Sequence, residues 1–155
     1  MKPTITLVHA PELRYDQNYG TLFSPLWAYT LAAHIPESWD VSIADCMVED
    51  PNSIPPADIF AFSGINQDIE SIREVHGLLK DKYPGSTFIL GGPITWSLEQ
   101  EGKLSILDFF DRLFILDGEE TLPAFLRKFA ADDLADVAKV IRAERFPLGQ
   151  ARPIR

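Results

Sequence analysis

The stretch Thr87-Phe88-Ile89-Leu90-Gly91-Gly92-Pro93-Ile94-Thr95 lies in the middle of the chain and decides its fold. Its first four residues are apolar or β-branched, which predicts a short strand buried on both faces, as in parallel sheets. Two glycines and a proline end this strand. Paired glycines let another body approach the backbone closely, because no Cβ stands in the way. A turn that requires positive φ explains the same glycines equally well.

The segments on both sides repeat this strand-and-helix pattern. Helices are predicted at about residues 24–35 and 67–83, at about 97–101, and from about residue 119 to 131, where Pro123 fits only within the first turn. The predicted strands are Ile5–Val8, Val41–Ala44, Asp58–Phe62, Thr87–Leu90 and Arg112–Leu116. Strands that alternate with helices predict a doubly wound, mostly parallel, five-stranded sheet in a three-layer α/β/α sandwich of the Rossmann-like or flavodoxin-like kind.

Length and composition narrow the classes of function. The 155 residues suit one domain, with 46% hydrophobic and 24% charged residues. A net charge of −9 without any basic run argues against a nucleic-acid partner. No apolar run is long enough for a membrane span, and no signal peptide is recognisable. The single cysteine, Cys46, excludes an internal disulfide framework and favours a cytoplasmic protein.

The domain is expected to occupy residues 1–131. Beyond Ala131 the pattern weakens, so residues 132–155 are interpreted as a C-terminal extension or linker.

Three predicted strands end in small or turn-forming residues. These ends are Ser63-Gly64, Gly91-Gly92-Pro93 and Asp117-Gly118-Glu119-Glu120. In a parallel sheet they lie side by side on one edge, where ligands of open α/β sheets bind. Together with the long loop from Glu12 to Thr21, they predict a backbone-lined shelf for a large flat ligand. Glycines that merely end strands are the alternative.

These pieces, in this order, resemble the N-terminal cobalamin-binding domain of B12-dependent radical SAM enzymes. The similarity runs from Thr4 to about Arg142 and also includes Leu7-Val8-His9-Ala10-Pro11 and the segment from Pro56 to Ser63. The resemblance implies that cobalamin is bound, without any catalytic residue in this chain. It implies cobalamin contacts from Ser63, Gly64, Ile65, Gly91, Gly92 and Pro93, and with less weight from Gly118, Glu119 and Glu120.

The sequence departs from that pattern in two ways. Many cobalamin modules supply a histidine to cobalt from an Asp-x-His-x-x-Gly motif, but here the position has Asp45-Cys46-Met47-Val48-Glu49-Asp50. No protein histidine is therefore expected on the cobalt. The cysteines that would hold an iron–sulfur cluster are also absent. The resemblance thus implies a fragment of a longer enzyme, whose cluster and S-adenosylmethionine would belong to a C-terminal radical SAM domain.

Single histidines and tryptophans have less distinctive explanations. His34, near a helix end, is expected to be a surface or cap residue, and His76 to lie at the border of its helix. His9 lies at the ligand edge, where a ligand contact and a structural role are equally supported. Trp96, just past the glycines, is the best candidate for stacking on a ligand.

Other classes of protein share this architecture. A response regulator would have an acidic pair after the first strand and a lysine after the fifth, and both are absent. A flavin module would need a phosphate-binding loop where Pro11-Glu12-Leu13-Arg14 stands. An interaction domain that has lost its cofactor stays an open alternative.

Overall fold

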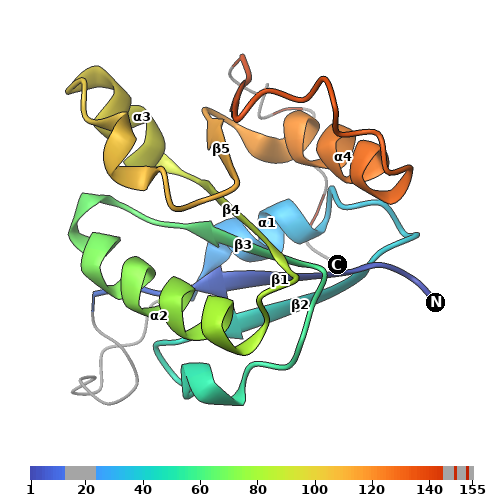
Figure 1. Ribbon diagram of the computed structural model, residues 1–155, viewed down its shortest axis with the longest axis horizontal. Helices are drawn as coiled ribbons and strands as arrows, with labels where there is room; N and C mark the ends of the chain where they lie inside the picture. Colours follow the sequence, from blue (N-terminus) through green and yellow to red (C-terminus); the bar gives the residue numbers. More distant parts are fainter. Residues whose placement is uncertain (13–23, 145–148, 150–152, 154–155) are drawn as a thin grey trace.

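The computed structural model describes residues 1–12, 24–144, 149 and 153, and these form one parallel sheet between two layers of helices (Figure 1). The strands are β1 (Thr4–His9), β2 (Asp40–Asp45), β3 (Ile59–Ser63), β4 (Thr87–Gly91), β5 (Arg112–Ile115) and β6 (Val140–Arg142). The α-helices are α1 (Leu26–Ala32), α2 (Ile69–Lys82), α3 (Pro93–Gln100) and α4 (Gly118–Ala130). The 3₁₀ helices are η1 (Pro51–Ser53), η2 (Asn66–Asp68) and η3 (Leu104–Leu107). The predicted doubly wound α/β class is confirmed.

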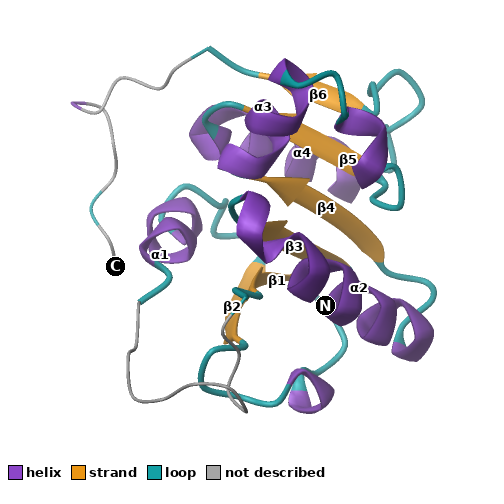
Figure 2. Ribbon diagram, turned by 90° about the vertical axis from the view of Figure 1, so that its left-hand side faces the viewer, coloured by secondary structure: helices purple, strands orange, loops and turns teal. Residues whose placement is uncertain are grey.

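The strand order is β2-β1-β3-β4-β5-β6, which Figure 2 shows from β2 at the bottom to β6 at the top. All five strand pairs are parallel. The register places His9 of β1 opposite Ser63 of β3, and Ser63 opposite Gly91 of β4. After β1, the chain adds β2 on one side of this strand and β3 on the other, so the direction in which strands are added reverses at β1. Ligands of open α/β sheets bind at the carboxyl edge beside such a switch point.

Alternating side chains divide the core between the two faces of the sheet. On β3, Phe60 and Phe62 pack on the face covered by α2 and α3, whereas Ile59 and Ala61 pack on the face covered by α1 and α4. The α2 helix buries Ile72, Val75 and Leu79, as its apolar spacing predicted. Full burial of one such side chain stabilises the fold by roughly 1.5–3 kcal/mol.

The sheet has one strand more than the five that were predicted. Residues 140–142 form β6, with Val140 opposite Leu113 and Ile141 opposite Phe114. Leu134 and Val137 pack against the same core as α1 and α4. Residues 140–142 therefore belong to the sheet, although they lie in the segment 132–155 that was interpreted as a C-terminal extension or linker. A three-residue strand gives too short a pattern to be recognised without its partner β5.

Helix bounds and buried histidines also differ from the sequence-based expectation. The α3 helix begins at Pro93, directly after the glycines, and not near Ser97. Pro123 is the sixth residue of α4 and so lies beyond its first turn. His34 follows the C-cap of α1 and is buried, so of the two predicted positions, surface or cap, the surface is excluded. His76 is buried among the rings of Phe88, Phe109 and Phe110.

Among the described residues, no helix combines the length and the apolar character that crossing a membrane requires.

Candidate functional site

The turns that follow β3 and β4 pack directly against each other. The Ile94 amide donates a hydrogen bond of 3.0 Å to the Gly64 carbonyl, which joins the two turns across the sheet edge. His9, Ser63 and Gly91 lie in one register row beneath them. The prediction that these strand ends lie side by side is confirmed.

A pocket of about 270 Å³ opens at this edge, on the face of the sheet that α1 and α4 cover. Its lining residues are Trp27, Thr30, Leu31, Ala61, Phe62, Ser63, Ile89, Gly91, Gly92, Pro93, Phe114, Leu116, Asp117, Gly118, Glu119 and Leu122. The interior is mainly apolar, and the polar groups come from Ser63, Thr30, Asp117 and Glu119. An apolar pocket with a few polar groups is the usual form of a small-molecule site.

Six of the nine predicted site residues line this pocket: Ser63, Gly91, Gly92, Pro93, Gly118 and Glu119. The other three, Gly64, Ile65 and Glu120, lie outside its lining. A Cβ on Gly64 would lie 2.9 Å from both Asp68 Oδ2 and Ile72 Cδ1, so this glycine faces the α2 side. The side chains of Ile65 and Glu120 are exposed to solvent.

The two glycines after β4 have different structural roles. Gly92 has φ 88° and ψ −176°, a backbone conformation that is essentially confined to glycine. A Cβ at this position would overlap with Ser63 Oγ and lie 3.2 Å from the Gly64 nitrogen. A Cβ on Gly91 would make only an ordinary contact, 3.4 Å from Phe114 Cβ. Gly92 is therefore required by the fold, whereas the space beside Gly91 belongs to the pocket.

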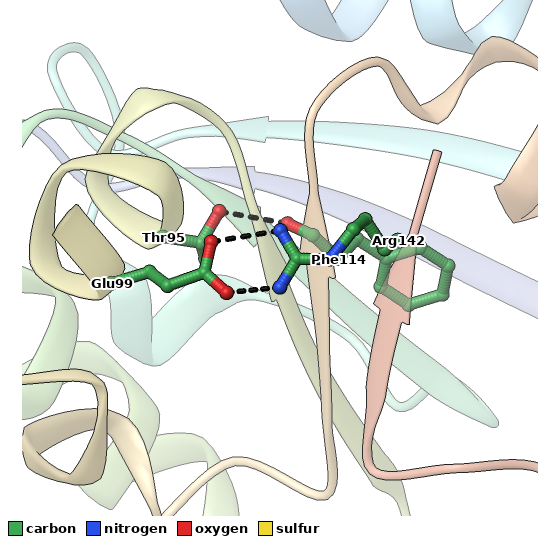
Figure 3. A network of polar contacts seen from close by, with 4 residues as sticks. All are labelled: Thr95, Glu99, Phe114 and Arg142. Carbon is green, nitrogen blue, oxygen red and sulfur yellow. Dashed lines mark hydrogen bonds and ion pairs between the residues drawn. The ribbon is translucent and has the colours of Figure 1, made fainter. Parts of the chain in front are cut away.

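A buried threonine fixes the Gly92 turn to the neighbouring strand (Figure 3). The hydroxyl of Thr95 lies 2.8 Å from the Gly92 carbonyl and 2.7 Å from the Phe114 carbonyl, so its single proton is shared between these two acceptor oxygens. Thr95 is fully buried, and its amide donates a further hydrogen bond of 3.2 Å to the Gly92 carbonyl. The sequence analysis assigned no role to Thr95, because its partner on β5 is distant in the sequence.

One turn further along α3, Glu99 pairs with Arg142 of β6 in a two-pronged ion pair (Figure 3). Hydrogen bonding to Arg142 lowers the pKa of Glu99, and the same bond raises the pKa of Arg142. Arg142 is half exposed and Glu99 is partly exposed, so solvent screens this pair and it adds little to the free energy of folding. Its structural effect is to link α3 to the last strand of the sheet.

Trp27 of α1 forms a pocket wall that the sequence analysis missed. Its Nε1 donates a hydrogen bond of 3.3 Å to Nδ1 of His9. Trp96, the residue favoured from the sequence, is half exposed and lies outside the pocket lining. Both tryptophans follow a strand end in the sequence, and they differ in which face of the sheet their helix covers. That difference depends on where each helix lies, which sequence spacing does not fix.

The bond from Trp27 also defines the state of His9. Because Nδ1 accepts the hydrogen bond from Trp27, the neutral ring carries its own proton on Nε2. Burial lowers the pKa of His9, and the charges of Asp45 and Asp68 oppose that shift only in part. Nε2 is buried and has no hydrogen-bond partner among the described residues. His9 is therefore held neutral, with its acceptor nitrogen already engaged.

The segment from Asp45 to Asp50, where the sequence lacks the histidine expected by resemblance, is held by local hydrogen bonds. The Asp45 amide donates to Glu49 Oε1 over 2.7 Å, and Asp45 Oδ1 accepts from the Met47 amide over 3.1 Å. Met47 itself is buried. Within the part of the chain that the structure describes, no three metal-binding side chains of the histidine, cysteine or carboxylate kind are grouped together.

Compared with known proteins, the chain matches no family model, and the search of curated proteins gives no match. The class of site that the geometry defines is a mainly apolar pocket at the carboxyl edge of a parallel α/β sheet.

The different roles of the two glycines predict different responses to alanine. Gly92→Ala should lower the free energy of unfolding by about 2 kcal/mol or more, because it combines a forbidden backbone with an overlap at Ser63. Gly91→Ala should cost less than about 1 kcal/mol, since its new methyl meets only an ordinary contact. Urea denaturation of both variants measures the difference. Equal stabilities would contradict the assignment of Gly92 to the fold.

The neutral state of His9 predicts a pH dependence of stability. The folded pKa lies below the ordinary value of 6.5, so below that pH the unfolded chain binds more protons than the folded one. Stability from this group is present above about pH 6.5 and is lost as the pH falls toward the folded pKa. In His9→Asn, which keeps an acceptor for Trp27, the fall in unfolding free energy between pH 7 and pH 5 should be smaller than in the wild type.

His76, whose pKa is also lowered by burial, contributes to the same slope and stays in both proteins. Any difference between the two slopes thus belongs to position 9. Urea denaturation at several pH values measures them, and identical slopes would rule out a buried neutral His9.

Proposed function

We propose that this chain is a cobalamin-binding domain that holds B12 at the carboxyl ends of β3, β4 and β5. The observation that carries this proposal is the pocket at those ends. Residues that the sequence resemblance implies as cobalamin contacts, including Ser63, Gly91 and Gly92, line one continuous apolar cavity. Together with Gly118 and Glu119, these residues come from the ends of β3, β4 and β5. Their position in one cavity supports a common binding role better than three separate turns would.

The size of the cavity limits which part of cobalamin can enter it. About 270 Å³ is slightly less than the volume of pockets for drug-sized molecules, and cobalamin is larger than such molecules. The part that would enter is a flat apolar one, such as the base at the end of the nucleotide tail, into the cavity lined by Trp27, Ala61 and Ile89. The corrin ring would then lie outside, over the glycine-lined rim. The absence of a Cβ atom at Gly91 permits that close approach.

The polar groups of the rim suit the amide side chains of the corrin ring. Asp117 and Glu119 border the pocket at the start of α4 and present carboxylate oxygens that accept hydrogen bonds from amide N–H groups. Ser63 adds a hydroxyl that can donate or accept. These residues would orient the cofactor rather than react with it.

The state of His9 supports cobalt without an imidazole from this chain. Metal binding needs a nitrogen lone pair, but Nδ1 of His9 accepts from Trp27 and Nε2 carries the proton. His34 and His76 are buried within the fold. Bound cobalamin supplies a cobalt centre able to carry a methyl group, and this chain would position it. By resemblance, the radical chemistry belongs to a separate radical SAM domain.

An interaction domain of the same fold is the second candidate. It is favoured by large apolar side chains exposed away from the pocket, namely Ile65, Trp96 and Ile106, which are 47%, 50% and 41% exposed. Such residues mark protein–protein contacts when they form a continuous patch. This candidate needs no cofactor, so cobalamin binding separates the two functions.

The proposal predicts that hydroxocobalamin co-elutes with the protein in gel filtration and gives a visible absorption spectrum there. Gly91→Leu should weaken binding at least tenfold, because the side chain would extend from the strand end into the pocket. Gly77→Leu on α2 is the matched control: a Cβ there meets nothing within 4 Å, and binding should not change. Both variants are first compared with the wild type by thermal melting.

A wild-type protein that elutes without the coloured cofactor would contradict the proposal. So would equal affinities of Gly91→Leu and the wild type.

A further inference from the structure

Four described residues have a positive φ angle, and for one of them the residue type is unusual at such an angle. Two are glycines, Gly92 and Gly102. Asp132, with φ 53°, is exposed and directly follows the C-cap of α4, a position where left-handed residues are common. The fourth is Leu116, with φ 69°. A leucine rarely adopts this conformation, because its Cβ crowds the neighbouring carbonyl.

The short turn that contains Leu116 explains why this residue has a positive φ angle, but it does not explain why the residue is a leucine. Only Leu116 and Asp117 separate the end of β5 at Ile115 from the start of α4 at Gly118. Such a short connection requires an unusual backbone angle, and glycine would supply it without crowding. The turn alone therefore gives no reason for a leucine.

The pocket supplies that reason. Leu116 is half-buried and belongs to the pocket lining, next to Phe114 and Asp117. Trp27 and Leu31 of α1 contribute to the same lining. At the start of α4, a Cβ on Gly118 would lie 3.5 Å from Leu31 Cδ1, so α1 and α4 are already close beside the pocket. A leucine at position 116 adds an apolar residue to this lining, where a glycine would add no side chain.

We propose that Leu116 is a specificity-determining residue of the pocket, kept in a strained backbone because its side chain contacts the ligand and sets the pocket width. Strain of this kind concentrates at ligand sites, where the rest of the fold holds it in place. The identity of the ligand as cobalamin rests on the function proposed above. The role of Leu116 as a wall depends only on the pocket.

The proposal requires that stability and binding respond differently to glycine at position 116. Leu116→Gly removes the crowding of the left-handed backbone, so the melting temperature without ligand should stay the same or rise. It also removes the apolar wall, so affinity for hydroxocobalamin should fall at least fivefold. Leu116→Asn tolerates the left-handed backbone and has a side chain of similar shape, but it should lower affinity because its tip is polar.

Asp132→Gly is the matched control. It releases the same kind of backbone strain at an exposed residue outside the pocket lining. Its melting temperature should be equal to or above that of the wild type, and its affinity should agree with the wild type within twofold.

A second probe separates this inference from the proposed function. N-phenyl-1-naphthylamine, a neutral apolar dye, is titrated into the same proteins and followed by fluorescence. If the wild type binds the dye but not hydroxocobalamin, the proposed function is wrong, and the loss of dye affinity in Leu116→Gly still tests the wall. The inference is overturned if Leu116→Gly melts clearly lower or fails to fold, if it binds as tightly as the wild type, or if the wild type binds neither probe.

Discussion

The contact between Gly92 and the Ser63-Gly64 turn is the constraint on which the rest of this sheet edge depends. Only a residue without Cβ fits there, and only glycine adopts its backbone angles. The contact brings the ends of β3 and β4 together, and the hydrogen bonds from Thr95 then tie that pair to β5. Three strand ends are thus fixed relative to one another before any ligand is present. A rim of this rigidity is suited to a large ligand, because little ordering remains to be done on binding.

The pocket itself results from how the helices share the two faces of the sheet. The α1 and α4 helices follow β1 and β5, while α2 and α3 cover the opposite face. β3 and β4 lie between β1 and β5. Their outer ends on the α1 and α4 face therefore border a cavity instead of a helix, with small residues such as Ala61 and Gly91 at its base. The contact that His9 makes with Trp27 sets one wall and engages the histidine nitrogen that could otherwise bind a metal.

The sequence was sufficient for features that depend on neighbours along the chain. Apolar runs such as Phe88 to Leu90 predicted the strands, and their turn residues predicted which ends would meet. Features that depend on contacts between residues far apart in the sequence could not be predicted from it. β6 is recognisable only beside β5, and the choice of Trp27 over Trp96 depends on which helix covers which face. Gly64 illustrates the same limit. As a glycine after a strand it was predicted to contact the ligand, but the position that a Cβ would occupy faces Asp68 and Ile72. Leu116 has no sequence signal at all, since its significance lies in a backbone angle.

The most direct measurement locates the bound cofactor by nuclear magnetic resonance of methyl groups. Hydroxocobalamin is added to protein labelled at its isoleucine and leucine methyl groups, and the shifts of Leu31, Ile89 and Leu122 are followed. These residues line the pocket, whereas Ile69, Leu98 and Ile106 line a separate groove between α2 and α3. Binding at the carboxyl edge predicts large shifts for the first group and none for the second. Shifts confined to Ile69, Leu98 and Ile106, or no shifts at saturating cofactor, would contradict a cobalamin site at this edge.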